Sequence, residues 1–300
     1  MSTTTVAVTQ MSCGPDTTGN LDRAEALVRK AAAMGAQIVL LQELFAGPYF
    51  CKVMRPEYFD WAAEAADSPV VSRMGELARE LGVVLPVSFF ERSGQAYFNS
   101  VVMLDADGRP LGTYRKAHIP QGPGYEEKYY FSPGDTGFRV WETCFGKIGV
   151  GICWDQWFPE AARCMALMGA DLLLYPTAIG SEPDMPDYDS CGHWQRTMQG
   201  HAAANMIPVC ASNRVGTETD GPVSLTFYGS SFIADVDGRM VAEAGREEEA
   251  VLLASFNFAE NARRRAGWGL FRDRRPDCYQ PLLDLGLNRN RDNKRSPGEK

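Results

Sequence analysis

Three reactive side chains each come directly after an apolar run that has the length and composition of a buried β-strand. They are Glu43, Lys116 and Cys153. A group at the end of a buried strand is held on a rigid edge and aimed at a cleft. If the three edges meet, a carboxylate, an ammonium and a thiol would supply a base, an electrostatic stabiliser and a nucleophile.

The context of Cys153 favours exposure of its sulfur. The residue stands in the segment Gly149-Val150-Gly151-Ile152-Cys153-Trp154-Asp155, and Pro159-Glu160 opens a helix soon after it. A thiol between a strand end and a helix start follows the logic of a nucleophile elbow, where nearby backbone N–H groups can hold an oxyanion. A small buried apolar group is the commoner role for a cysteine, so both interpretations stay open on this context alone.

A nucleophilic thiol needs a base, and the sequence offers histidines and carboxylates. His118, His193 and His201 carry no local signature of a Cys–His pair. Glu43 at its strand end would be partly desolvated, which would raise its pKa toward a value useful for proton transfer. An ammonium from Lys116 beside the thiol would favour the thiolate. The alternatives are a solvated strand terminus for the glutamate and a surface position for the lysine.

The elements that must position these residues alternate between helical and strand patterns. Apolar residues at helical spacing predict helices at residues 21–31, 70–81, 159–168 and 193–206. Short apolar runs predict strands at residues 5–8, 38–41, 83–87, 100–104, 111–115, 148–153, 171–175, 208–212, 232–236 and 240–242. The pattern indicates an α/β fold.

The second half of the chain repeats the order of the first half. Met34-Gly35-Ala36 and Met168-Gly169-Ala170 each precede an apolar strand, and Asp105-Ala106-Asp107-Gly108 is matched by Asp235-Val236-Asp237-Gly238. Two similar halves, each with an apolar sheet face, would bury those faces against each other. We therefore expect a four-layer α-β-β-α sandwich with two pseudo-symmetric halves and a site near the C-terminal edges of its strands.

Composition is that of a globular protein. The 300 residues are 45% hydrophobic and 23% charged. No linker-like stretch divides the chain, so we expect a single domain over residues 1–287 and a flexible, polar C-terminal tail over 288–300. The net charge of −8 argues against nucleic acid as a partner, and the arginine-rich stretches 263–265 and 272–275 are expected to form surface or interface ion pairs.

The same composition argues against a membrane or secretory context. No apolar run approaches the ~18–20 residues that span a bilayer, and the first residues lack a signal-peptide pattern. The eight cysteines are scattered and show no zinc-binding spacing. We expect a cytoplasmic protein with reduced thiols, no metal, no other cofactor and no membrane partner.

The three reactive segments together resemble the nitrilase, or carbon–nitrogen hydrolase, superfamily, whose catalytic set is glutamate, lysine and cysteine. The matching segments are Leu40-Leu41-Gln42-Glu43-Leu44-Phe45, Tyr114-Arg115-Lys116-Ala117-His118-Ile119-Pro120 and Gly151-Ile152-Cys153-Trp154-Asp155-Gln156-Trp157-Phe158-Pro159-Glu160. The resemblance covers nearly the whole chain. It implies that Glu43 is the general base, Lys116 the transition-state stabiliser and Cys153 the nucleophile, with the N–H of Trp154 joining Lys116 at the oxyanion. It also implies a homo-oligomer, a dimer or larger.

Two further features refine the resemblance. A second family glutamate, which orients the triad, maps to Glu127 in the segment 122–128, with Glu126 as the neighbouring alternative. Trp154-Asp155 stands where true nitrilases usually have Trp-Glu, which points to the amidase and carbamoylase branches.

The loop after the strand at 171–175 indicates the charge of the substrate. Residues 118–125 and 181–202 resemble superfamily members that act on a carbamoylated diamine, and the loop carries four carboxylates with no Lys or Arg before Arg196. A distal ammonium would be favoured there and a distal carboxylate would not, although a solvated acidic loop is the alternative. The expected substrate is a small cationic ureido compound, and the expected binding residues are Tyr125, Glu126, Glu182, Asp187 and Asp189.

Other functions stay open at this point. One is a β-ureidopropionase-like or ω-amidase-like hydrolase with an acidic carbamoyl or amide substrate. Another is an inactive scaffold of the same fold, although the chain retains all three reactive residues. A nucleotide-binding protein is disfavoured, because no G-x-G-x-x-G follows a strand and no P-loop is present.

Overall fold

The computed structural model of the chain describes residues 3–286, which separate into two compact units. The first unit ends at Ala262 and the second begins at Arg263. The single domain expected over residues 1–287 stays a prediction, and the tail expected at 288–300 lies outside the described residues.

The first layer of strands consists of two sheets that meet at β2. Its strands are β1 (Thr4–Ser12), β2 (Ile38–Leu40), β3 (Leu85–Ser93), β4 (Ala96–Leu104), β5 (Pro110–Arg115), β10 (Arg214–Asp220), β11 (Val223–Tyr228) and β14 (Ala250–Phe256). One sheet has the order β11-β10-β1-β14 with β2 pairing to β1, and the other has the order β3-β4-β5. The N–H of Val39 in β2 donates to Val84 O at 3.0 Å, just before β3, and so connects the two sheets.

The second layer is one six-stranded sheet with the order β13-β12-β9-β8-β7-β6. Its strands are β6 (Val140–Thr143), β7 (Gly146–Val150), β8 (Leu172–Pro176), β9 (Val209–Ser212), β12 (Phe232–Ala234) and β13 (Met240–Glu243). Strands β7, β8 and β9 are parallel neighbours, so their C-terminal ends meet at one edge. That edge is where ligands bind in open α/β sheets.

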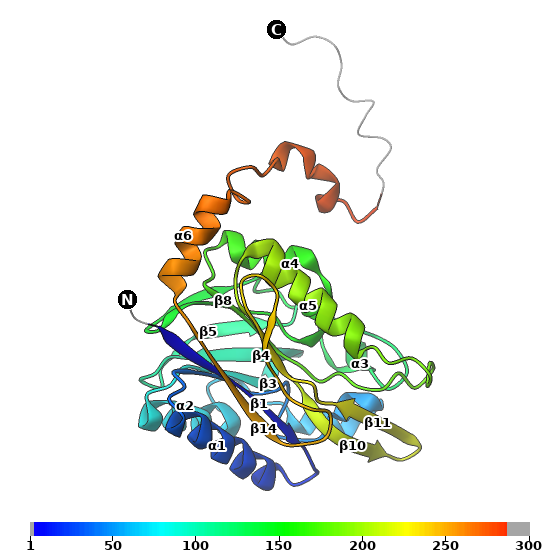
Figure 1. Cartoon of the computed structure of the whole chain (residues 1–300). Coiled ribbons are helices and arrows are strands. Elements are labelled where there is room, and N and C mark those ends of the chain that lie inside the picture. Colours follow the sequence, from blue (N-terminus) through cyan, green and yellow to red (C-terminus); the bar gives the residue numbers. More distant parts are fainter. Residues whose placement is uncertain (1–2, 287–300) are drawn as a thin grey trace. The chain divides into compact units, whose positions relative to one another are not determined.

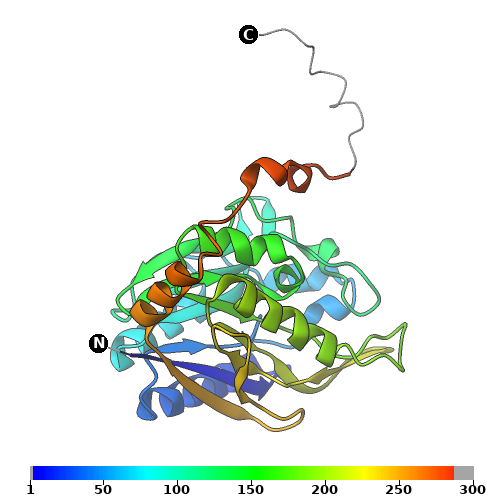
Figure 2. The ribbon, with the colours of Figure 1, turned by 45° about the horizontal axis from the view of Figure 1, so that its top comes forward.

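Helices complete the four layers of the first unit. They are α1 (Thr17–Ala33), α2 (Pro69–Leu81), α3 (Glu127–Tyr130), α4 (Pro159–Leu167) and α5 (Cys191–Asn205), with 3₁₀ turns at Phe50–Lys52, Pro56–Trp61 and Cys153–Trp157. Helix α6 (Phe258–Trp268) begins in the first unit and ends in the second, which also contains 3₁₀ turns at Pro276–Cys278 and Gln280–Leu283. Helices α1 and α2 cover the outer face of the first layer, and α4 and α5 cover the outer face of the second (Figure 1, Figure 2). This arrangement confirms the α-β-β-α sandwich.

Two apolar cores hold these layers together. Val28 and Met74 from the two helices lie in one cluster with Val39 of β2, between the helices and the first sheet layer. Leu40 of β2 lies in a second cluster with Leu174 of β8, between the two sheet layers. All five side chains are completely buried. The neighbours Val39 and Leu40 face different cores because successive side chains on a strand point to opposite faces.

The repeated residues occupy equivalent places in the two halves. Gly35 before β2 and Gly169 before β8 both have a φ of +93°. Gly108 and Gly238, which close the equivalent turns, have φ angles of +79° and +78°. A Cβ at Gly108 or at Gly238 would lie within 2.6 Å of a backbone carbonyl of the neighbouring helix. The duplication expected from the sequence is therefore confirmed at the level of backbone geometry.

The structure differs from the expected strands at several points. Strand β7 ends at Val150 rather than reaching Cys153, because the Asp155 carboxylate accepts the N–H of Ile152 at 2.9 Å and turns the chain away from the sheet. The hairpin of β10 and β11 has polar alternation without an apolar run, and no strand was expected there. Within residues 3–286, none of the helices is both long and apolar enough to span a bilayer.

Candidate active site

The ends of three strands bring the reactive residues together in the interior. Glu43 lies just beyond β2, Lys116 directly after β5, and Cys153 beyond β7. Lys116 Nζ donates to Glu43 Oε1 at 2.9 Å and to Glu127 Oε2 at 2.6 Å. Cys153 and Glu127 line the same pocket, and the charges of Glu43 and Lys116 both act on the Cys153 thiol. The sequence prediction that these edges meet is correct.

Glu43 has one carboxylate oxygen engaged and one without a partner. Its Oε1 accepts from Lys116 and also from Asn99 Nδ2 at 2.6 Å. Its Oε2 is buried and has no hydrogen-bond partner among the described residues. An ionised carboxylate oxygen that no protein donor occupies is still able to take a proton. Oε2 is therefore the oxygen of Glu43 that can accept a proton.

The charged partners keep Lys116 protonated. Burial disfavours the ammonium, but the carboxylates of Glu127 and Glu43 outweigh it and raise the Lys116 pKa well above its ordinary value. Burial also raises the pKa of Glu127 to about 7, against the opposing effect of the Lys116 charge. Tyr49 OH donates to Glu127 Oε1 at 2.7 Å and fixes that carboxyl group.

The structure distinguishes the two neighbouring glutamates. Glu127 is completely buried and bonded to Lys116, whereas the partly exposed Glu126 binds the side-chain amide of Gln121. The pocket lining includes Glu127 and does not include Glu126. Glu127 is therefore the glutamate that lies with the triad.

Cys153 occupies a strained turn. It has a φ of +39°, a region that residues with a Cβ rarely adopt, and it is the first residue of the 3₁₀ turn Cys153–Trp157. Its Sγ donates to Ala178 O at 3.7 Å. The N–H of Trp154 belongs to the first turn, where N–H groups have no partner within the helix. That N–H and Lys116 are the two donors expected at an oxyanion.

Burial controls the protonation of the thiol. It raises the Cys153 pKa well above the ordinary value, the charge of Glu43 raises it further, and the charge of Lys116 only partly opposes this. The charge of Lys116 does favour the thiolate, as expected, but burial and the charge of Glu43 outweigh it. The neutral thiol requires a base at the moment of reaction.

Above the thiol lies a pocket of about 190 Å³. Of the residues expected to bind substrate, Tyr125 and Glu182 line it. The sequence analysis did not select three further lining residues, Trp157, Asp184 and Met185. Trp157 follows the cysteine by four residues in the same 3₁₀ turn, a spacing that could have indicated it.

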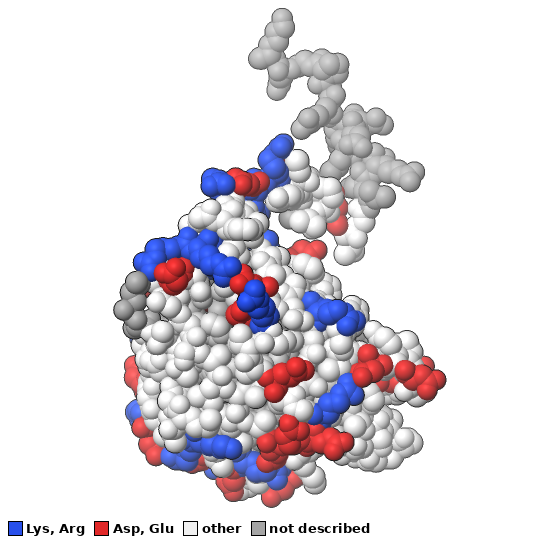
Figure 3. Space-filling view, in the orientation of Figure 1, with Lys and Arg blue, Asp and Glu red and all other residues white. Residues whose placement is uncertain are grey.

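Two of the predicted carboxylates lie elsewhere. Asp187 and Asp189 are exposed and are not among the residues that line the pocket. Asp189 forms an ion pair with Arg246 at 2.6 Å, so its charge is already matched on the surface. Figure 3 shows acidic side chains at the tip of this loop, between β8 and α5, where Asp184 and Asp187 are exposed. Glu126, Asp187 and Asp189 therefore lie outside the lining of this pocket, and their roles in binding stay predictions.

A model of a known protein family matches most of the sequence. The carbon-nitrogen hydrolase model matches residues 5–265. The chain belongs to the carbon–nitrogen hydrolase family. An N-carbamoylputrescine amidase of Solanum lycopersicum is 57% identical over 285 residues, which are 94% of this chain and 95% of that protein. A citrullinase of Francisella tularensis is 57% identical over 93% of this chain and 97% of its own length. The crystal structure of a carbon–nitrogen hydrolase from Helicobacter pylori G27 has a TM-score of 0.89 at 37% identity and covers 95% of this chain and 100% of that chain.

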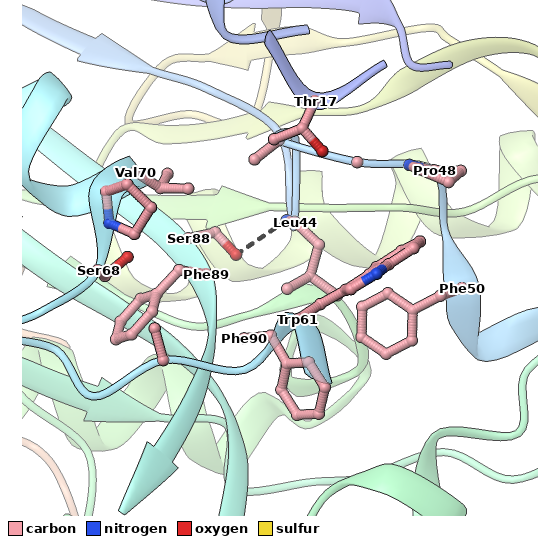
Figure 4. Close-up of a pocket in the computed structure, with 14 residues that line it drawn as sticks. Thr17, Leu44, Pro48, Phe50, Trp61, Ser68, Val70, Ser88, Phe89 and Phe90 are labelled. Carbon is pink, nitrogen blue, oxygen red and sulfur yellow. Dashed lines mark hydrogen bonds between the residues drawn. The ribbon is translucent and has the colours of Figure 1, made fainter. Parts of the chain in front are cut away.

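This carbon–nitrogen hydrolase has a second pocket, of about 210 Å³, on the loop that follows Glu43 (Figure 4). Leu44, Phe50, Trp61 and Phe90 are among its lining residues, and no residue in the lining is ionisable. Figure 4 shows the hydroxyl of Ser88 directed at the backbone of Leu44. This pocket lacks acid–base groups, whereas Glu127 and Cys153 line the pocket described above. Within residues 3–286, no group of three or more metal-binding side chains is arranged to hold an ion.

Proposed function

We propose that the chain hydrolyses N-carbamoylputrescine to putrescine, ammonia and carbon dioxide, a step in polyamine biosynthesis from agmatine. The observation that supports this most directly is the buried cluster of Glu43, Lys116 and Glu127 beside Cys153, beneath a pocket that carries Glu182. The amidases that are named for this substrate are also 54–57% identical to the chain across most of its length.

The first half of the proposed reaction forms an S-carbamoyl enzyme. Glu43 takes the thiol proton on its unpartnered Oε2, and the thiolate of Cys153 attacks the ureido carbon. The oxyanion is stabilised by Lys116 and by the N–H of Trp154. Glu43 then returns the proton to the substituted nitrogen, the C–N bond breaks, and putrescine leaves.

The second half hydrolyses the thioester-like intermediate. Glu43 takes a proton from water, and the resulting hydroxide attacks the carbamoyl carbon. The tetrahedral intermediate expels the sulfur, which recovers its proton from Glu43, and carbamate decays to ammonia and carbon dioxide. Glu127 acts as the positioning carboxylate, because it shares the ammonium of Lys116 with Glu43 and is itself held by Tyr49.

The pocket mouth suits a distal ammonium. Glu182 is half buried, and burial raises its pKa above the ordinary value, so a cation beside it would favour the ionised form. Asp184 adds a second carboxylate, and Trp154, Trp157 and Tyr125 supply aromatic faces that attract cations. An acidic substrate would meet like charge at the same positions.

Citrulline is a second candidate substrate because a citrullinase is as similar to this chain as the plant amidases are. Citrulline also carries a ureido group and an ammonium, but it adds a carboxylate. The carboxylates Glu182 and Asp184 in the lining favour the diamine derivative over this amino acid.

Product analysis on a small panel would test the proposal. The panel contains N-carbamoylputrescine, citrulline, N-carbamoyl-β-alanine and an ω-amide of a dicarboxylic acid. We expect putrescine and ammonia from the first compound at the highest kcat/KM, and at least ~10-fold loss of that preference in Glu182→Gln. Cys153→Ser is the control for contaminating activity. Faster turnover of citrulline, or of either acidic compound, would overturn the substrate assignment.

The homo-oligomer and the cytoplasmic location stay predictions.

A further inference from the structure

One buried arginine binds the backbone of the loop that carries Glu43. Arg214 begins β10 and its side chain is completely buried. One guanidinium nitrogen donates to Glu43 O at 2.9 Å and to Leu44 O at 2.7 Å, and another donates to Gly47 O at 3.0 Å. A guanidinium presents five donors in a fixed planar fork, so its separate nitrogens can hold three carbonyls and the Glu218 carboxylate at once, whereas an ammonium has three donors on a single nitrogen.

The bound loop contains a strained residue that sets the direction of Glu43. Leu44 has a φ of +48°, which is unfavourable for a residue with a side chain. Its N–H donates to Ser88 Oγ at 3.0 Å, as Figure 4 shows, and its carbonyl accepts from Arg214. Strained backbone persists only where its surroundings over-determine it. The turn that directs Glu43 is therefore held by hydrogen bonds at both the N–H and the carbonyl of Leu44.

Glu218, the ion partner of Arg214, is connected through Tyr49 to Glu127, the second carboxylate bound to Lys116. Glu218 accepts from Arg214 at 2.8 Å through Oε1, and from the N–H of Tyr49 at 2.5 Å through Oε2. Lys52 Nζ lies 3.6 Å from the same Oε2. Tyr49 in turn holds Glu127 through its hydroxyl. One ion pair thus connects the backbone on both sides of the site.

We propose that Arg214 is a positioning residue that, with Glu218, sets the relative placement of Glu43 and Glu127 around Lys116. This inference rests on the proposed function only in giving Glu43 the role of base. A purely structural ion pair would stabilise the fold without affecting the reaction. The two roles predict different kinetics and can be separated.

The test uses Arg214→Lys in the full-length chain, because lysine keeps the charge and loses the fork. We expect kcat for N-carbamoylputrescine to fall at least ~10-fold with KM unchanged within about twofold, because a misplaced base affects the transition state more than binding. The rate at which iodoacetamide labels Cys153, followed by mass spectrometry of its peptide, should fall by a similar factor. Labelling needs no substrate, so it tests positioning even if the proposed substrate is wrong.

Val28→Ala is the matched control, since it removes buried volume under α1, on the outer side of the first sheet layer. It should lower Tm and leave both kcat and the labelling rate unchanged. Glu218→Gln keeps the shape and removes one acceptor, and it decides the question if Arg214→Lys does not fold. The proposal is overturned if the folded variants keep kcat and labelling within twofold of the parent, or if Val28→Ala reduces both to the same extent.

Discussion

At the scale of single residues, burial sets the chemistry of this site more strongly than any one charge. The Cys153 thiol is kept protonated by burial despite the nearby ammonium. The Lys116 ammonium is kept charged by two carboxylates despite burial. The resting site therefore holds a neutral nucleophile, a charged stabiliser and a carboxylate with one open oxygen. We therefore expect it to act by proton transfer during the attack rather than by a preformed thiolate.

Substitution of Glu43 tests this point directly. Glu43→Gln can still accept from Asn99 or Lys116, but it loses the oxygen that takes the proton. We expect kcat to fall at least ~10³-fold, because the loss of any one member of a catalytic unit removes nearly all of the enzyme's activity. Steady-state kinetics and circular dichroism would check this. A folded variant with a tenth or more of the parent activity would remove Glu43 from the role of base.

Glu127 predicts a pH dependence of stability. Its pKa is raised from 4.5 to about 7, so between these values the folded protein retains a proton that the unfolded chain releases. This group's contribution to stability is therefore complete below about pH 4.5 and is lost as the pH rises through about 7. Glu127→Gln does not titrate, so its Tm should rise relative to that of the parent between about pH 5 and 7.5. A difference in Tm that stays constant across this range, measured by calorimetry, would contradict the raised pKa.

At the scale of elements, the positions that were predictable are those where an apolar run meets a polar residue. Glu43 and Lys116 follow such runs, and the two sheets of the first layer bring them into contact. The role of Arg214 was not predictable, because β10 has no apolar run and the carbonyls of Glu43 and Leu44 that it binds lie about 170 residues away in the sequence. A pattern along the chain reports which face of a strand is buried, and it does not report which loop a buried arginine will reach.

The end of β5 depends on a close backbone approach. A Cβ at Gly134 would lie 2.1 Å from Arg115 O and 2.8 Å from Lys116 O, and the Gly134 N–H donates to Lys116 O at 2.8 Å. Gly134→Ala must therefore displace the strand end that carries Lys116. We expect kcat to fall ~10–100-fold with a loss of about 1–3 kcal/mol in the free energy of unfolding.

Gly200→Ala is the control for this substitution. Gly200 lies in α5 with nothing within 4 Å of an added Cβ, and alanine favours a helix over glycine by about 1 kcal/mol. The free energy of unfolding should therefore rise or stay constant, and kcat should not change. Equal effects of the two alanines, in kinetics and in urea unfolding, would show that the contact at Gly134 does not position Lys116.

At the scale of the whole molecule, the two similar halves explain why the site is assembled from distant segments. Glu43 follows β2 of one half, and Cys153 follows β7 of the other. The two sheet layers face each other across a shared core, so residues at their edges meet without a long loop. The nucleophile and the proposed base therefore depend on the stability of that core as well as on their own turns.

The residues after Ala262 lead to a prediction about assembly. Trp268, Leu282 and Leu283 are 71%, 62% and 78% exposed in the single chain, which is unusual for large apolar side chains outside an interface. The arginine-rich stretch nearby forms local ion pairs, Arg272 with Asp273 and Arg275 with Asp277, as expected from the sequence. We expect these apolar residues to be covered by another copy of the chain.

Sedimentation velocity would test this assembly. The parent should sediment as a dimer or larger, and the double variant Leu282→Asp with Leu283→Asp should shift toward smaller species, because two carboxylates would be costly to bury in an apolar interface. Met34→Asp is the control, since Met34 is 51% exposed at the end of α1 and lies in the first unit. A monomeric parent would exclude the assembly. If instead the parent is oligomeric and the double variant sediments unchanged, the interface lies elsewhere, and the exposure of these leucines has another cause.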